Sequence, residues 1–63
     1  MSAITKKALS ESLIRLLKEK PLSKITISDI TGDCGMNRHT FYYHFRDIND
    51  LIAWTFETSS IQV

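Results

Sequence analysis

The sequence predicts an all-α fold, and three observations support this prediction. Apolar residues recur at helical spacing along much of the chain. Residues that cap helices stand just before several of these apolar runs. No segment shows the alternation of apolar and polar residues that is typical of a strand. We therefore expect three short helices packed as a bundle, followed by the start of a fourth, connecting helix.

The first helix is expected from about Ala3 to Glu19. Its apolar stripe repeats at helical spacing and consists of Ile4, Leu9, Leu13, Leu16 and Leu17. Pro21 cannot continue a helix and disfavours helical backbone at the residue before it. Residues 20–24 are therefore expected to form a loop.

The second helix is expected to begin after Thr26, whose hydroxyl can cap the free amides of the first turn. Asp29 stands three places later, where a carboxylate complements the positive end of the helix dipole. Ile25 and Ile30 flank the cap at the spacing of a hydrophobic staple. These signals together predict a firmly fixed start for this helix.

A tight turn should separate the second helix from the third. The second helix is expected to end near Cys34, because Gly35 accepts the left-handed backbone of such a turn. A third helix is expected over Asn37–Arg46, with the asparagine as its N-cap. Phe41 and Phe45 lie one helical turn apart, so they should share a buried face.

A fourth helix is expected from the cap residue Asp47 to about Thr58, with Asp50 in its first turn. Three large apolar residues follow that a core of this size cannot all bury, namely Trp54, Phe56 and Ile61. We expect some of them to face a neighbour that this sequence does not contain.

Two of these helices meet through a short turn that contains a glycine, which is the plan of a helix-turn-helix unit. Thr31 is small, so the third helix can cross close to the second. The apolar wedge between the two helices is expected to consist of Ile27, Ile30, Cys34, Met36 and Phe41. An ordinary helical hairpin has the same spacing, so this pattern leaves both interpretations open.

The outer face of the third helix favours a role in binding DNA. Successive residues of an α-helix are about 100° apart. If the two phenylalanines point inward, the outermost side chains are His39, Tyr43 and Arg46, and Thr40 and Tyr42 lie on opposite flanks. A helix in the major groove needs such a division, because its ridge meets base edges and its flanks meet phosphates. A solvated helix more often carries strong helix formers such as Glu, Lys or Ala.

The net charge of +1 does not by itself indicate a nucleic-acid partner. The charges are unevenly distributed, with +4 on residues 1–24 and −3 on residues 25–63. Residues 36–46 carry two arginines, two histidines and no acid, as a phosphate-facing segment requires, although chance also produces such runs. Lys6 and Lys7 are interpreted as a solvated helix start, with a phosphate-contacting arm as the alternative.

The composition excludes several other classes of protein. A chain of 63 residues makes one small domain that usually needs a disulfide, a metal or a partner. Cys34 is the only cysteine, which excludes an intrachain disulfide and fits a reducing, cytosolic setting. Together with His39 and His44 it matches no common zinc spacing, so we expect neither metal nor cofactor. A partner is therefore the expected support.

Enzymes and membrane proteins are also not expected. The chain shows no nucleophile–base pair and no phosphate-cradling glycine loop, so we expect no catalytic activity. No apolar run is long enough to span a bilayer, and the N-terminus lacks the apolar core of a signal peptide.

Two segments of the sequence, residues 26–30 and 35–46, resemble the signature of the TetR family of transcriptional regulators. In that family T-x-x-x-I in the second helix leads to G-V-S-x-x-T-L-Y-x-H-F-K. Here the segments read Thr-Ile-Ser-Asp-Ile and Gly-Met-Asn-Arg-His-Thr-Phe-Tyr-Tyr-His-Phe-Arg. The resemblance extends over roughly residues 4–57. The aromatic run followed by Trp54-x-Phe56 resembles the branch that contains the dihydroxyacetone kinase operon regulator.

The resemblance implies a role for each matching residue. Thr40, Tyr42 and His44 match phosphate-contacting positions, and His39 and Tyr43 match positions that reach bases. The expected DNA-binding residues are Thr26, Ser28, Asn37, Arg38, His39, Thr40, Tyr42, Tyr43, His44 and Arg46.

This sequence departs from the family pattern at two positions. Ile48 stands where many members carry a phosphate-binding lysine, so that contact is expected to be absent or moved to Arg46. Ser28 stands where some members place a base-reading arginine, so readout should depend on His39, Tyr43 and Arg38.

The resemblance also implies an organisation that extends beyond this chain. Residues 1–46 would form the helix-turn-helix domain, and residues 47–63 would begin a helix leading to an absent effector-binding and dimerisation domain. The expected partners are double-stranded DNA with a palindromic operator, a second copy of the full-length protein, and a small-molecule effector in the absent domain, with no membrane. The expected location is the bacterial cytoplasm, at the nucleoid when DNA is bound. The alternative is a protein-interaction module that docks another protein on the exposed aromatics of the third helix.

Overall fold

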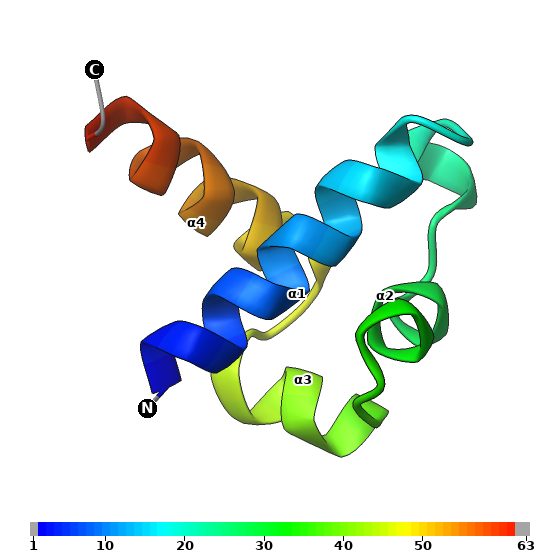
Figure 1. Cartoon of the computed structure of the whole chain (residues 1–63), viewed down its shortest axis with the longest axis horizontal. Helices are drawn as coiled ribbons and strands as arrows, with labels where there is room; N and C mark the ends of the chain where they lie inside the picture. Colours follow the sequence, from blue (N-terminus) through cyan, green and yellow to red (C-terminus); the bar gives the residue numbers. More distant parts are fainter. Residues whose placement is uncertain (1, 62–63) are drawn as a thin grey trace.

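The computed structural model describes the backbone of residues 2–61 and the side chains of residues 3–57 (Figure 1). The elements in chain order are α1 (Ser2–Leu17), the short 3₁₀ helix η1 (Leu22–Lys24), α2 (Ile27–Cys34), α3 (Arg38–His44) and α4 (Ile48–Ile61). Residues 2–61 contain no strand, and the expected all-α bundle with a fourth helix is confirmed.

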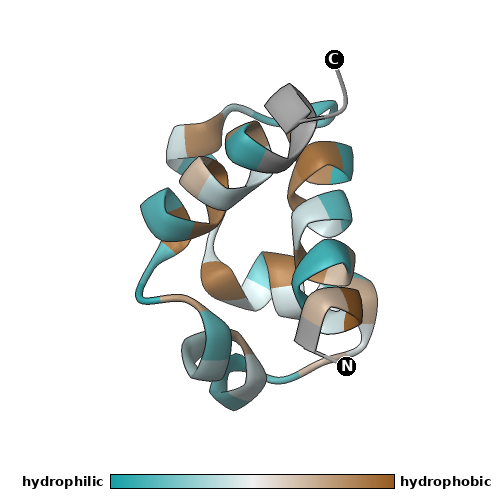
Figure 2. Ribbon diagram, turned by 90° about the vertical axis from the view of Figure 1, so that its left-hand side faces the viewer, coloured by the Kyte–Doolittle hydropathy of each residue, from teal (hydrophilic) through white to brown (hydrophobic). Residues whose placement is uncertain are grey.

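Helix α1 is the central element of the bundle. It packs against α2, α3 and α4, and α2 also packs against α3 (Figure 1). Apolar and polar segments alternate along the helices, as expected where one side of each helix is buried (Figure 2). The buried core draws on every α-helix and its flanks and consists of Leu9, Leu13, Ile25, Ile30, Phe41, Phe45 and Leu51.

The expected turn between α2 and α3 is confirmed. Gly35 has a φ of 75°, in the left-handed region where a side chain is strained. Its amide donates to the carbonyl of Thr31, and the amide of Met36 donates to the same oxygen at 2.8 Å. Asn37 then caps α3, because its Oδ1 accepts the amide of Thr40 at 2.9 Å. This turn fixes the direction in which α3 leaves α2.

The expected cap of α2 is also confirmed. Thr26 Oγ1 accepts the amide of Asp29 at 3.1 Å, and Asp29 Oδ2 accepts the amide of Thr26 at 3.0 Å. Ile25 and Ile30, the expected staple pair, both lie in the core. Thr31 is buried, and its hydroxyl donates to the carbonyl of Ile27 at 3.0 Å, so it presents no unpaired polar atom to α3.

Three expectations about the elements before α2 and after α3 were wrong. Helix α1 ends at Leu17 rather than Glu19, because its last turn tightens and the amide of Glu19 donates to Leu16. The expected loop after Pro21 contains η1, closed by a 2.9 Å hydrogen bond from the amide of Lys24 to the proline carbonyl. Helix α4 continues to Ile61, past the expected end at Thr58.

Helix α3 also ends earlier than expected, since it spans Arg38–His44 after the confirmed Asn37 cap and stops before Arg46. Phe45 follows it with extended backbone, at φ −136° and ψ 149°. Asp50 explains this early end, because its Oδ2 accepts the amide of Arg46 at 3.0 Å and its own amide donates to Asp47 Oδ1 at 2.9 Å. The cap of α4 therefore engages residue 46, which cannot continue α3.

Two ion pairs join α1 and the residues that follow it to α2, and thereby bring the two oppositely charged parts of the sequence together. Arg15 contacts Asp33 at 2.6 Å, and Lys20 contacts Asp29 at 2.9 Å. The hydrogen bond from Lys20 lowers the pKa of Asp29, with a further contribution from the amide of Thr26. The hydrogen bond from Arg15 lowers the pKa of Asp33 in the same way.

Candidate DNA-binding surface

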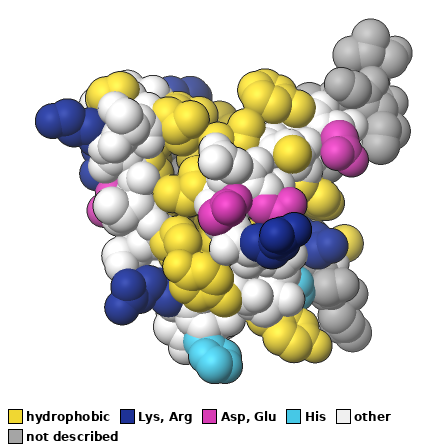
Figure 3. Space-filling model, turned by 180° about the vertical axis from the view of Figure 1, so that it is seen from behind, with side chains coloured by type: hydrophobic (Ala, Val, Ile, Leu, Met, Phe, Trp, Pro, Cys, Tyr) yellow, Lys and Arg dark blue, Asp and Glu magenta, His cyan; other side chains and the backbone are white. Residues whose placement is uncertain are grey.

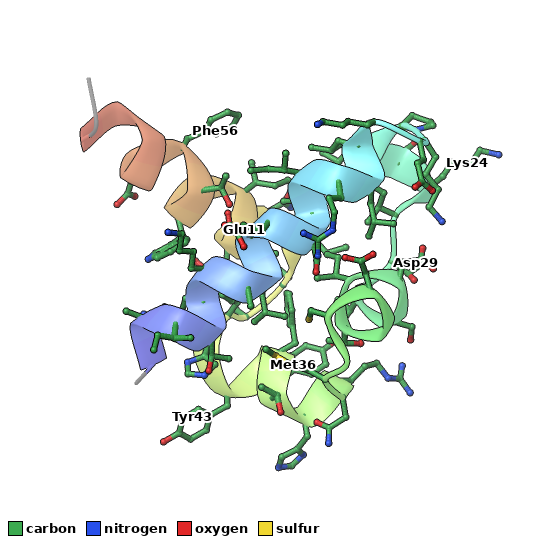
Figure 4. All side chains as sticks on the ribbon, viewed as in Figure 1. Glu11, Lys24, Asp29, Met36, Tyr43 and Phe56 are labelled. Carbon is green, nitrogen blue, oxygen red and sulfur yellow. The ribbon has the colours of Figure 1, made fainter. Side chains whose placement is uncertain are left out.

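Helix α3 turns its phenylalanines inward and its tyrosines outward. Phe41 and Phe45 are only 0% and 4% exposed, whereas Tyr43 is 83% exposed and Tyr42 is 57% exposed. Figure 4 shows Tyr43 pointing away from the bundle, below α3. Burial of the two phenylalanine rings fixes the rotation of the helix about its axis, which confirms the predicted orientation.

The predicted site residues of α3 form one continuous surface. Asn37, Arg38 and His39 are exposed, and Thr40 and His44 are half-buried on its edges. Asn37 Oδ1 is occupied by the amide and hydroxyl of Thr40, which leaves the Asn37 amide nitrogen as a donor. The surface therefore presents hydrogen-bond donors and aromatic edges and no carboxylate.

Thr26 and Ser28 belong to the N-terminal end of α2 and are both exposed. The turn that leads to α3 lies at the other end of this eight-residue helix, so these residues form a separate edge beside α3. The Thr26 hydroxyl accepts a hydrogen bond from the amide of Asp29 within α2.

Arg46 does not lie on the ridge of α3, contrary to the prediction, because the helix has ended before it. Its side chain is exposed, and it lines a surface hollow with Asp47, Asn49 and Asp50. Asp47 and Asp50, which line the same hollow, oppose the approach of a phosphate to Arg46. Ile48 is half-buried against the core, so this position does not offer a group for phosphate binding.

A second hollow lies where α1, α3 and α4 meet. It is lined by Lys6, His44, Phe45, Asp50, Ala53, Trp54 and Glu57, and the Lys6 Nζ lies 6.0 Å from the centre of the Phe45 ring. Lys6 therefore borders the end of the α3 surface. No local pattern in the sequence indicated this proximity, because the two helices involved are distant along the chain.

The part of the chain that the structure describes shows neither a metal-binding cluster nor a membrane span. Within it, no group of at least three His, Cys, Asp or Glu side chains is arranged so that it could hold a metal ion. None of the helices in this part combines the length and the apolar character that a membrane span requires.

The comparisons with known proteins agree with this geometry. Residues 9–53, from the middle of α1 into α4, match the family model described as bacterial regulatory proteins, tetR family. The chain belongs to the TetR family. One relative of this TetR-family chain is the HTH-type dhaKLM operon transcriptional activator DhaS of Lactococcus lactis subsp. lactis (strain IL1403). The two are 32% identical over 56 residues, which are 89% of this chain and 30% of the relative. The relative supports the resemblance to the dihydroxyacetone kinase branch.

Proposed function

We propose that this chain is a DNA-binding part of a transcriptional regulator that inserts α3 into the major groove. One observation carries the proposal: the outward face of α3 is free of acid and rich in aromatic and hydrogen-bonding groups, while buried Phe41 and Phe45 hold it in place. An α-helix fits the major groove, which is about 12 Å wide. The family match and the name of the DhaS relative support the same role.

The exposed side chains suggest a division of work on the DNA. Tyr43 is the most outward of the α3 aromatics, and His39 lies one turn before it, so we propose that these two read base edges. Tyr42 and Thr40 lie on the flanks, where hydroxyls meet the phosphate walls. Arg38 adds a permanent charge at the start of the helix.

Further proposed contacts lie around this central surface. Asn37 can donate its amide nitrogen to a phosphate beside the groove, and exposed Thr26 lies at the N-terminal end of α2, where we propose that it borders the DNA backbone. Ser28 is exposed on α2 and His44 is half-buried at the end of α3, and we propose that each borders the DNA at one edge of the surface. Arg46 is the weakest member of the set, because two carboxylates lie beside it.

The organisation of the full protein is part of the same proposal. The chain spans about 30% of the length of its DhaS relative. We propose that residues 1–46 act as the DNA-binding domain and that residues 47–63 lead to a domain for dimerisation and effector binding. Two such heads would bind palindromic half-sites about one helical turn apart. Such a regulator would act in the bacterial cytoplasm.

The test is the binding of the chain to a labelled duplex of mixed sequence over a range of salt concentrations. Contacts to several phosphates should make affinity fall steeply with salt. Tyr42→Phe should weaken binding to every sequence. Tyr43→Ala and His39→Ala should instead change which sequences are selected from a random pool, because one side chain that reads a base supplies about 1–3 kcal/mol of discrimination. Binding that is insensitive to salt and to all three substitutions would favour a protein-docking surface.

A further inference from the structure

Both histidines of this chain lie on α3, within the proposed DNA surface. Histidine is the side chain whose charge ordinarily changes between about pH 5 and pH 8. The net charge is +1 with both histidines neutral, so two added protons would raise it to +3. In a chain with so little net charge, protonation of α3 changes the electrostatics of DNA binding substantially.

Few permanent charges lie near α3, so protonation of the histidines changes the charge of this segment by a large fraction. Residues 36–46 carry two arginines, Arg38 and Arg46, so protonation of both histidines would double the positive charge of the segment from two to four. Arg46 is partly offset by the carboxylates beside it. Two more bases, Arg15 and Lys20, are held in ion pairs with α2. The histidines are therefore the main adjustable charges of this face.

The surroundings of His39 are almost free of acid. His39 is exposed, and α3 itself contains no carboxylate. Helix α3 packs against α1 and α2; the acid of α1 is Glu11, which is exposed, and the two acids of α2, Asp29 and Asp33, are each paired with a base. With α3 in the groove, the DNA phosphates on either side would therefore be the principal anions near a protonated His39, even while its ring reads a base edge.

His44 has more varied surroundings. Its ring lies 5.0 Å from that of Tyr43, and it shares a hollow with Lys6 of α1 and with Asp50 and Glu57 of α4. One base and two acids thus line the same hollow as His44. We expect both histidines to contribute to the dependence of binding on protons.

We propose that DNA binding by α3 is linked to proton uptake by His39 and His44, so that affinity rises as the pH falls. The inference rests on the proposed function. A phosphate in contact with imidazole stabilises its protonated form, and by linkage the protonated chain binds DNA more tightly. Because each added phosphate contact contributes about 0.9 to the salt slope, a protonated histidine that makes such a contact should contribute up to about tenfold in affinity at 0.1 M salt.

The experiment measures fluorescence anisotropy of a labelled mixed-sequence duplex about two helical turns long, with the 63-residue chain at constant ionic strength. Affinity should rise about tenfold or more between about pH 8 and pH 6, and the salt slope should be steeper at the lower pH. Circular dichroism at both pH values verifies that the fold is retained. Binding that is equally tight at both pH values would overturn the inference and leave the proposed function intact.

Substitutions assign the protons to residues. His39→Gln and His44→Gln should each remove part of the pH dependence, and the double variant should remove nearly all of it. Arg38→Gln is the matched control, because loss of a permanent charge from the same helix should lower affinity at every pH and preserve the pH dependence. A double variant that keeps the full pH dependence would overturn the assignment. Absence of binding at every pH, even in low salt, would overturn the proposed function itself.

Discussion

The two sides of α1 are packed differently. Toward α2 and α3 the bundle is closed by two ion pairs and by the fully buried ring of Phe41. Toward α4 an apolar groove remains open, lined by Leu13, Ile14, Leu17, Leu22, Ile52, Thr55 and Phe56. Hydrophobic side chains also gather on the back of the molecule in the space-filling view (Figure 3).

This difference indicates where the stability of the domain resides. The α2–α3 unit has its own caps, turn and apolar wedge, and it presents the proposed DNA surface from a closed core. Helix α4 is anchored by Leu51, which is fully buried, while Phe56 farther along is 67% exposed. The expectation that some late aromatics would remain uncovered is confirmed for Phe56. Trp54 is half-buried against the core, and the Ile61 side chain lies outside those described.

The largest expected effect compares one phenylalanine from each side. Phe41→Ala removes a fully buried ring and should cost about 3–5 kcal/mol. A core this small rarely supplies more than about 3–5 kcal/mol in total, so the variant should be largely unfolded at room temperature. Far-UV circular dichroism and urea titration measure this loss.

Phe56→Ala is the matched control for that experiment. Its ring is already mostly in solvent, so the substitution should change the free energy of unfolding by less than about 1 kcal/mol. Equal losses for the two variants would show that the groove is as well packed as the α2–α3 side.

Local signals explain why the α2–α3 side could be predicted so fully. The cap at Thr26, the turn at Gly35 and the cap at Asn37 each depend on residues within a few positions of one another. The rotation of α3 followed from Phe41 and Phe45 and the helical repeat alone. Most of the fold and the face of the candidate site were therefore available from the sequence.

The features that the sequence did not predict arise between distant residues. The ion-pair partners of Asp29 and Asp33 are one example, because they depend on how α1 lies against α2. The early end of α3, which removes Arg46 from the ridge, depends on competition from the cap of α4. The position of Lys6 beside Phe45 depends on the same tertiary packing.

The two glycines give the next largest effect and sharpen the contrast between the turn and the helix body. Gly35→Ala forces a side chain into left-handed backbone and should cost about 1–2 kcal/mol. Gly32 lies within α2 with open space around its Cα, so Gly32→Ala should stabilise the chain by about 0.5–1 kcal/mol. Thermal unfolding of the two variants should shift in opposite directions, and shifts of the same sign would argue against the assigned turn.

A single part-buried hydrogen bond tests the α4 side. Ser10 Oγ lies 2.7 Å from Thr55 Oγ1, whose own hydrogen is directed to the carbonyl of Leu51 at 2.8 Å, so Ser10 is the donor. Ser10→Ala and Thr55→Val should each cost about 0.5–1.5 kcal/mol and should show coupling in a double-mutant cycle. Ser12→Ala is the control, because Ser12 accepts from Arg15 on the other side of α1 and should be additive with Thr55→Val. Additivity of the Ser10 and Thr55 variants would show that α4 is not held by this bond.

The smallest effect expected is the response of the α1–α2 ion pairs to acid. The pKa of Asp33 is held below its ordinary value of 3.8 by the hydrogen bond from Arg15. Folding therefore favours the ionised carboxylate, and this contribution is complete above about pH 4 and is lost as the pH falls through the lowered pKa of the folded chain.

Melting temperatures measured from about pH 6 down to about pH 2.5 should therefore decline less in Asp33→Asn than in the unmodified chain. Glu11→Gln, which changes an exposed acid of α1, is the matched control and should leave the decline as it is. If the melting temperature of the Asp33→Asn variant declines as steeply as that of the unmodified chain, the ion pair does not hold α2 against α1 in solution. The closed character of that side would then depend on the apolar wedge and the helix caps alone.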